Sequence, residues 1–274
     1  MFPTHSETDH GTRRRTDWRT VTVVLGSLLL VYYLVPMAAL VVAQSPLALA
    51  RHATSPYVLT AASNSLVSSA ASTLIAAAFG LPLAYWLART DVRGKTLVTT
   101  VVILPLVLPP IVSGMLLVKV FGPMSLGGVV ADATGVSLTR SLVGVVLAQT
   151  FVASPFLVVT AKAAFEEVDP QLEHASRSLG RDRWTTLRKV TLPLAKPGIV
   201  AGLTLTFARA MGEFGATIMM AYYPRTMPVE IWVSWQSRGL DAALPVALVL
   251  VGIAVATLLV IHLLGANPWG ATDA

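Results

Sequence analysis

Six apolar stretches, each long enough to cross a membrane as a helix, constrain this chain more than any other feature. The hydrocarbon core of a bilayer is about 30 Å thick, which takes about 20 helical residues. Stretches of this length, rather than shorter alternating segments, favour an α-helical bundle over a β-barrel. We therefore predict an all-α membrane protein with about six transmembrane helices. The stretches are Val21–Ala43, Ala61–Ala88, Thr96–Val118, Ser141–Ala161, Pro197–Ala221 and Ala242–Leu264.

The overall composition supports a membrane protein. Hydrophobic residues make up 54% of the 274 residues and charged residues only 12%, whereas about 25% of an ordinary soluble domain is charged. The chain has no cysteine, which excludes disulfide frameworks and thiolate metal sites. The histidines show no metal-ligand spacing, and we expect neither a metal nor a cofactor.

The positions of the basic residues predict the orientation of the helices. With the N-terminus inside, fourteen Lys and Arg residues fall on the cytoplasmic side, five fall outside, and Arg209 lies within a span. An excess of this kind is typical of cytoplasmic loops. We therefore expect a multi-pass protein of a prokaryotic cell membrane, in contact with lipid and with both termini in the cytoplasm. The net charge of +6 is explained by topology, and we expect no nucleic-acid partner.

No internal repeat or linker divides the chain, so we expect one transmembrane domain over residues 20–264. Residues 1–19 and 265–274 are polar and lack apolar periodicity, which predicts short cytoplasmic tails. The first apolar stretch follows several arginines, as a signal peptide would. Its uncharged run exceeds the usual signal length of about 7–15 residues, so we interpret it as a retained helix.

The only long polar segment between apolar runs is Glu166–Gly198. Asp169 followed by Pro170 is a helix start, and Gly180 can adopt the left-handed conformation that ends a helix. Between them, an apolar face predicts a short amphipathic helix at the cytoplasmic surface. This face consists of Leu172, Ala175 and Leu179.

A second helical turn is expected after Gly180. Asp182 can cap it, Trp184 and Leu187 share one face, and Leu192-Pro193 is expected to end it at the entry to the fifth span. Two interpretations of this helix–glycine–helix elbow remain open. It is either a rigid element that carries motion from a soluble partner, with the Trp184/Leu187 face fixing it to a span, or a solvated turn that only sets topology.

At this point the sequence resembles a known family. Glu173–Gly180 followed by Val190–Pro193 is similar to the "EAA" loop of permease subunits of ABC importers, E-A-A-x₃-G-x₉-I-x-L-P. The start departs from that pattern, because His174 stands at the Glu position and Ser176 at the second Ala. Glu173 is the nearest acidic residue. The resemblance implies an ATPase-coupling role for Glu173, His174, Ala175, Gly180, Leu192 and Pro193.

Further segments, spread over about residues 60–240, resemble the molybdate/sulfate branch of that family. They are Leu81–Tyr85, Ala88–Thr90, Arg93–Lys95, Leu104–Pro110, Ala208–Ala216 and Ala221–Pro224. The resemblance implies a homodimeric permease for a tetrahedral oxyanion, molybdate or tungstate first and sulfate or thiosulfate as the alternative. It also implies two copies of a cytoplasmic ATPase and an extracytoplasmic binding protein as partners.

The chain itself shows no nucleotide site, so we expect it not to be an enzyme. Gly94-Lys95-Thr96 is the nearest approach to a P-loop, but Arg89 stands where the first glycine is needed. A secondary transporter driven by an ion gradient remains the rival from another class, although no repeated halves are visible. A membrane-embedded enzyme is a third option, for which no nucleophile–base arrangement can be found.

Arg209 and Glu213 are the charged residues of the fifth stretch. An ionised side chain near the bilayer centre costs about 2.5–3.5 kcal/mol, so such residues usually face the bundle interior and form pairs. At positions i and i+4 they would lie on one helical face. They are either a structural ion pair or part of the translocation pathway, where Arg209 would lower the barrier for an oxyanion.

Two weaker signals are the prolines of the third apolar stretch and a lone polar residue of the fourth. Pro105, Pro109 and Pro110 predict a kink in the third stretch, which is either gate-forming or only structural. Gln149, a lone polar residue of the fourth stretch, is expected to be a packing partner rather than a ligand.

Overall fold

The computed structural model describes residues 18–42 and 45–263. The chain divides into two compact units, Met1–Ser45 and Pro46–Ala274. In the first unit, helix α1 (Trp18–Val42) is 25 residues long, contains Pro36 and has no buried residue. The predicted tails, except for residues 18 and 19 at the start of α1, lie outside the described residues, so their conformation stays a prediction.

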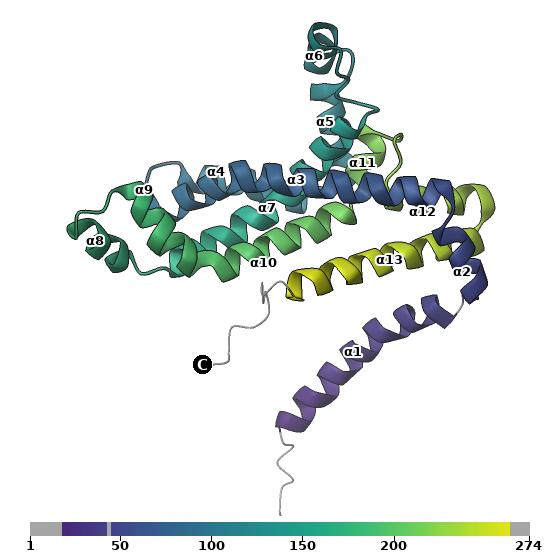
Figure 1. The fold of residues 1–274 in the computed structure, drawn as a ribbon, viewed down its shortest axis with the longest axis horizontal. Coiled ribbons are helices and arrows are strands. Elements are labelled where there is room, and N and C mark those ends of the chain that lie inside the picture. Colours follow the sequence, from purple (N-terminus) through teal and green to yellow (C-terminus); the bar gives the residue numbers. More distant parts are fainter. Residues whose placement is uncertain (1–17, 43–44, 264–274) are drawn as a thin grey trace, which may run out of the picture. The chain divides into compact units, whose positions relative to one another are not determined.

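All the regular secondary structure in the described part of the second unit is helical, and no strand occurs there (Figure 1). This confirms the predicted all-α class. The helices are α2 (Pro46–Ala53), α3 (Pro56–Arg89), α4 (Lys95–Val107), α5 (Pro110–Phe121), α6 (Leu126–Thr134), α7 (Leu142–Glu167), α8 (Pro170–Ser178), α9 (Arg183–Thr186), the π-helix η1 (Leu187–Thr191), α10 (Leu192–Met211), α11 (Gly215–Met220), α12 (Met227–Arg238) and α13 (Leu240–Leu263).

Three long helices, α3, α7 and α10, contact one another and form the centre of this unit (Figure 1). Their largest hydrophobic core cluster contains Phe165, Leu87 and Leu157, all nearly inaccessible. The helices approach closely: a Cβ atom at Gly198 would lie 2.5 Å from the Cβ of Ala164. Lipid tails are as apolar as leucine, so helices in a membrane associate mainly through such close packing of small residues.

The third predicted span is interrupted. Helices α4 and α5 meet at an angle of 115° across a break, which confirms the predicted kink in the stretch Thr96–Val118. Leu108 and Pro109 are both extended, with ψ values of 135° and 133°. A residue before proline is pushed out of the helical region, and two adjacent prolines remove two backbone donors. Pro105, by contrast, lies buried within α4.

The fifth predicted span is also interrupted, so a continuous helix over Pro197–Ala221 was a wrong prediction. Helix α10 ends at Met211, and α11 begins after Glu213 and Phe214. The Glu213 carboxylate accepts a 2.7 Å hydrogen bond from the Ala216 N–H. An acidic side chain that caps a new helix competes with continuation of the previous helix.

The short helix α11 packs against α5. A Cβ at Gly114 of α5 would lie 2.7 Å from the Met219 Cβ and 2.9 Å from the Ala216 Cα. The two half-helices that follow the two breaks are therefore locked together, and Figure 1 shows them on the same side of the α3–α7–α10 core.

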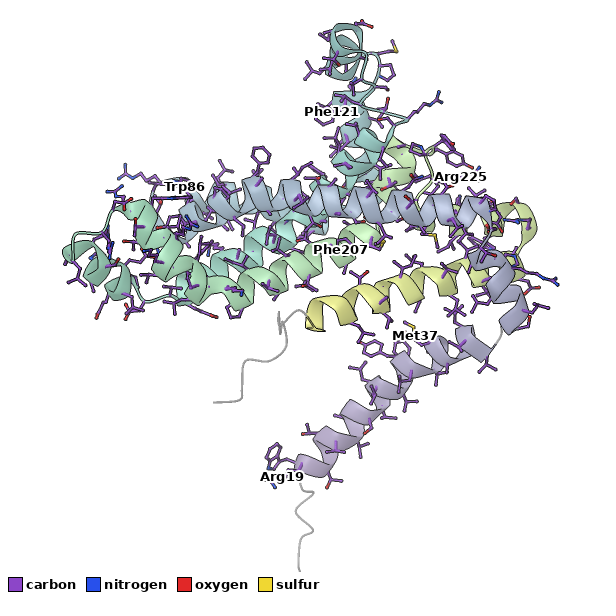
Figure 2. All side chains as sticks on the ribbon, viewed as in Figure 1. Arg19, Met37, Trp86, Phe121, Phe207 and Arg225 are labelled. Carbon is purple, nitrogen blue, oxygen red and sulfur yellow. The ribbon has the colours of Figure 1, made fainter. Side chains whose placement is uncertain are left out.

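Large apolar side chains are exposed along the outside of the long helices. Leu74 and Phe79 on α3 are 70% and 75% accessible, and Trp86 near the end of α3 points away from the bundle (Figure 2). A soluble monomer rarely exposes a continuous apolar surface of this kind. Five described helices are long and apolar enough to cross a membrane, or six if the bent α4–α5 pair is one span, which agrees with the predicted number.

The connections between the spans carry three helices that the sequence did not predict, α2 and α12 at the end of α3 far from the elbow and α6 beyond α5 (Figure 1). The start of α12 is fixed to α3, since the Met227 N–H donates to Ser65 Oγ at 2.8 Å and Asn64 Nδ2 donates to the Arg225 carbonyl at 2.9 Å. Arg225 forms an ion pair with Glu230 at 3.1 Å. This end of the unit is therefore held by polar contacts.

Candidate functional site

Helix α8 forms as the sequence predicts. The Asp169 carboxylate accepts a 2.8 Å hydrogen bond from the Gln171 N–H, and Pro170 occupies the first turn. Beyond its end, Gly180 has φ +83°, a conformation that side chains with a Cβ disfavour. The predicted left-handed glycine is thereby confirmed, and the chain reverses there into α9.

The second arm of the elbow differs from the prediction. Asp182 caps α9 as expected, and hydrogen bonding from Thr185 and then from Trp184 lowers the pKa of its carboxyl group. Leu192-Pro193, however, does not end this arm, because α9, η1 and α10 follow without a gap. The Leu192 N–H bonds the Leu187 carbonyl in a π-turn. The wider turn accommodates a proline that cannot donate to the preceding turn and whose ring would clash with it.

Glu173 lies at the centre of the elbow and is only 7% accessible. Its Oε1 atom accepts hydrogen bonds from Arg89 Nε at 3.0 Å, from Arg89 Nη2 at 2.8 Å and from Thr191 Oγ1 at 2.9 Å. Arg89 Nη2 also donates to the Val168 carbonyl at 3.0 Å. One carboxylate thus joins α8 to the last residue of α3 and to η1. We call these contacts the Glu173 latch.

The face predicted from Leu172, Ala175 and Leu179 is exposed on α8. Leu179 is 84% accessible, and His174 is exposed as well. On the second arm, Leu192 is half-buried and packs against the main core cluster, whereas Pro193 is exposed. The six predicted coupling residues all lie on the elbow, but Glu173 is buried while His174 and Ala175 are exposed, His174 on the side of the cavity and Ala175 on the opposite side.

The predicted Trp184/Leu187 face does not fix the elbow to a span. Trp184 is 66% accessible, and only Leu187 is half-buried. The Glu173 latch does so instead, together with a 3.0 Å hydrogen bond between the hydroxyl groups of Ser176 and Thr186 that joins α8 to α9. An ion pair and hydroxyl hydrogen bonds, rather than packing of the Trp184 ring, therefore attach the elbow to the spans. The ring can remain exposed because Trp side chains are enriched at the membrane–water interface.

Arg89 and Thr191 are site residues that the sequence analysis missed. Arg89 is 84 residues from Glu173 along the chain, and although it lies within the family-like segment Ala88–Thr90, nothing in the sequence assigned it a carboxylate partner. The signal that could have identified it was an Arg immediately after an apolar run, opposite the acidic residue nearest to an EAA-like glycine. Nothing local to Thr191 indicated its role.

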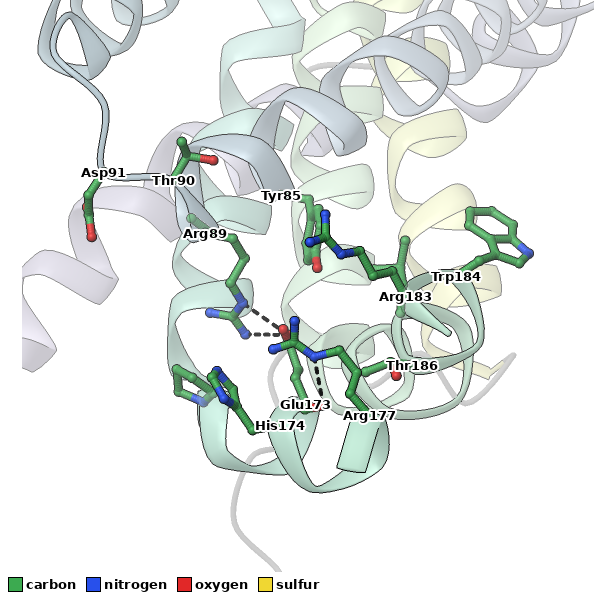
Figure 3. A pocket seen from close by; sticks show the side chains of 13 residues that line it. Tyr85, Arg89, Thr90, Asp91, Glu173, His174, Arg177, Arg183, Trp184 and Thr186 are labelled. Atoms are coloured by element: carbon green, nitrogen blue, oxygen red, sulfur yellow. Dashed lines mark hydrogen bonds and ion pairs between the residues drawn. The ribbon is translucent and has the colours of Figure 1, made fainter. Parts of the chain in front are cut away.

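A cavity of about 710 Å³ opens between the end of α3 and the elbow (Figure 3). Its floor is the Glu173 latch. Arginine side chains from α3, α8 and α9 point into it, and Trp184 lies at its edge. The cavity is lined by Tyr85, Ala88, Arg89, Thr90, Asp91, Pro170, Glu173, His174, Arg177, Arg183, Trp184, Thr186 and Leu187.

Arg209 and Glu213 form the predicted ion pair, with Arg209 Nη2 2.5 Å from Glu213 Oε2. They do not share one helical face, because α10 ends between them. The Glu213 side chain is 1% accessible and that of Arg209 is 28% accessible. The buried carboxylate is therefore neutralised by the nearby Arg209 and accepts a hydrogen bond from α11 at Oε1, whereas Oε2 is buried without a well-aligned hydrogen bond and the guanidinium group keeps an open side.

The ion pair and the elbow lie at opposite ends of α10. Pro193 and Arg209 are separated by about 24 Å at 1.5 Å per helical residue. Several buried polar groups occur on the helices around the two breaks without a hydrogen-bond partner, including the Ser113 and Thr217 hydroxyls and both amide atoms of Gln149. Within the described residues, no group of three or more His, Asp or Glu side chains could hold a metal ion.

Comparison with protein families gives a clear result. Residues 80–267 match the family described as the inner membrane component of binding-protein-dependent transport systems. A probable molybdenum ABC transporter permease of Haloferax volcanii is 65% identical, and the match covers 92% of each chain. The molybdate/tungstate permease WtpB of Thermococcus kodakarensis is 36% identical over 87% of this chain and 92% of its own length. The molybdenum permease ModB of Mycobacterium tuberculosis is 39% identical over 79% and 83%, respectively.

Solved structures agree on the fold. A chain of a bacterial alginate ABC transporter, solved in complex with its alginate-bound periplasmic protein, superposes with a TM-score of 0.71 at 19% identity. The match covers 92% of this chain and 93% of that chain. A chain of the MetNI methionine ABC transporter gives a TM-score of 0.60 at 19% identity, over 76% of this chain and 94% of that chain.

Proposed function

This chain belongs to the family of inner membrane components of binding-protein-dependent transport systems, and we propose that it is the permease subunit of an ABC importer for molybdate or tungstate. The observation that carries the proposal is the near-complete match to relatives named for these oxyanions, at identities from 36% to 65%. A permease of this kind is not expected to carry its own ATPase. Hydrolysis would be supplied by two copies of a separate cytoplasmic chain.

The elbow is the proposed docking element for that ATPase. Its outer face presents Leu172, Ala175 and Leu179 to solvent, whereas the Glu173 latch holds its inner side on α3 and η1. A displacement of α8 would therefore be transmitted through the Glu173 latch to α3 and, through η1, to α10. This arrangement favours the mechanical interpretation of the elbow over a turn that only sets topology.

The Arg209–Glu213 pair is the proposed polar element of the translocation pathway. Arg209 has an open side, and a positive group lowers the electrostatic barrier for a divalent oxyanion. Glu213 holds the guanidinium group and weakens its attraction for the substrate, so that release remains possible. The buried, unpartnered polar groups near both helix breaks support a polar environment on this side of the bundle.

The proposed assembly is a homodimer of this chain with two ATPase subunits and an extracytoplasmic binding protein, in a prokaryotic cell membrane. The basic-residue distribution supports an orientation with both termini and the elbow in the cytoplasm. The binding protein would select the oxyanion and deliver it to the opposite side.

Reconstitution tests the function. Proteoliposomes that contain the chain, its ATPase and its binding protein should take up labelled molybdate only when ATP is present on the side of the membrane where the ATPase is bound. The isolated chain should neither bind nor hydrolyse ATP. Uptake driven by an ion gradient without ATP would instead support the secondary transporter and would refute the proposal.

The role of Arg209 needs a matched pair of variants. In Arg209→Met/Glu213→Leu, ATP hydrolysis should persist while molybdate uptake falls at least about tenfold, the effect of roughly 1.4 kcal/mol on the barrier. Arg225→Met/Glu230→Leu removes another ion pair near α12 and should preserve uptake. Near-normal uptake by the first variant would show a purely structural pair, since a buried ion pair is often dispensable when both partners are replaced.

A further inference from the structure

The cavity behind the elbow faces away from the surface that we assign to the ATPase. Successive residues of a helix are 100° apart, so Leu172, Ala175 and Leu179 lie on one side of α8. Arg177 and His174, which line the cavity, lie on the opposite side. The cavity is therefore not part of the outer apolar face, and its chemistry needs a separate explanation.

The cavity has an excess of positive charge. Arg89 is satisfied by Glu173, whereas Arg177 donates only to the Glu173 backbone carbonyl, at 3.3 Å. Arg183 forms no ion pair with any described residue. Asp91, the other acidic residue of the lining, is fully exposed and pairs with Lys95 at 3.5 Å. Two guanidinium groups thus face one space without a carboxylate partner of their own, and guanidinium groups bind phosphate oxygens in bidentate fashion.

The cavity also lies where two apolar helices meet the membrane surface. Arg89 ends the 34-residue helix α3, and Arg183 begins the apolar segment that continues through Met211. Tyr85 lies one turn inside α3, and Trp184 stands exposed at the rim (Figure 3). Tyr and Trp are enriched at the level of the lipid headgroups, and basic pockets between spanning helices are typical headgroup sites.

We propose that this cavity binds the phosphate headgroup of an anionic membrane lipid. Arg177 and Arg183 bind the phosphate oxygens, and the Trp184 ring lies against the apolar part of the lipid. A headgroup held in this way bridges α8 and α9 across Gly180 and stiffens the elbow. Lipid binding at this cavity depends on the basic and aromatic side chains at the ends of α3 and α9, so it is independent of which ion the protein transports.

The test measures binding of phosphatidylglycerol to the purified full-length chain in neutral detergent, by native mass spectrometry. Each basic side chain near an anionic surface contributes about a factor of five to affinity, so Arg177→Gln/Arg183→Gln should weaken binding roughly 30-fold. Arg188→Gln/Lys189→Gln is the matched control, because it removes the same charge from exposed residues of η1 that do not line the cavity. The control should lose at most about threefold, since exposed charges are screened by salt.

Three outcomes would overturn the proposal. One is an equal loss in both double variants, which would show diffuse attraction. Another is binding of phosphatidylcholine as tight as that of phosphatidylglycerol. The third is displacement of the lipid by millimolar inorganic phosphate, which would show a soluble-anion site.

Trp184→Ala keeps both arginines and should weaken lipid binding several-fold without affecting the binding of inorganic phosphate. This variant keeps the proposal testable even if the double variant unfolds.

Discussion

Removal of the Glu173 carboxylate should loosen the elbow by an amount that its contacts define. Oε1 accepts three hydrogen bonds from Arg89 and Thr191, and the side chains of Arg89 and Glu173 are only 16% and 10% accessible. Removal of one partner of a buried ion pair costs about 3–5 kcal/mol. Arg89 keeps its bond to the Val168 carbonyl and some contact with water, so we expect about 2–3 kcal/mol for Glu173→Ala.

A double-mutant cycle measures this coupling directly. Thermal unfolding of the purified transporter carrying Glu173→Ala, Arg89→Ala or both should give an interaction energy of about 2 kcal/mol. Lys162 and Glu166 form a control ion pair on one face of α7 at 2.7 Å, with the Glu166 side chain 42% accessible. The same cycle on that pair should give less than about 0.5 kcal/mol, as exposed pairs do.

The latch should also affect coupling between hydrolysis and transport. In Glu173→Ala, the ATPase should still dock on the outer face of α8 and hydrolyse ATP, but fewer molybdate ions should be transported for each ATP. The comparison uses uptake and phosphate release in the same proteoliposomes. The latch between the elbow and α3 would be refuted by two results together. The stability losses of Glu173→Ala and Arg89→Ala would add up within about 0.5 kcal/mol, and the number of molybdate ions transported per ATP would be unchanged.

Three further substitutions test other parts of the structure. Gly180→Ala should lower stability by about 1–2 kcal/mol in thermal unfolding, through its backbone alone, because no atom lies within 4 Å of the new Cβ; an unchanged melting temperature would contradict the left-handed turn. Ala175→Glu should release the ATPase in a pull-down assay while membrane insertion stays intact, and undiminished binding would favour a turn that only sets topology. Gly114→Ala should destabilise the α5–α11 contact by about 1–3 kcal/mol, whereas Gly26→Ala, whose Cβ meets no atom within 4 Å, is a control that should not.

Much of the fold follows from local sequence. Apolar length predicted the spans, because a helix in lipid must satisfy its own backbone hydrogen bonds. The Asp169-Pro170 start and the left-handed Gly180 were also predictable, since capping and φ preferences depend on one or two residues. The exposed face of α8 followed from helical periodicity in the same way. Most of the candidate elbow could therefore be located before its structure was known.

The tertiary structure alone decided how these elements are joined. The Glu173 latch needs Arg89 from a distant helix, and no local pattern predicts which of many basic residues will meet a given carboxylate. The Arg209–Glu213 pair was visible in the sequence, but the break of the fifth span at Met211, where Glu213 also accepts a hydrogen bond from the Ala216 N–H, was not, because an uninterrupted helix also places residues i and i+4 side by side. Hydrophobicity specifies that a segment lies in the membrane, but side-chain contacts that form only in the folded chain determine which helices are joined, as Arg89 and Glu173 show across 84 residues.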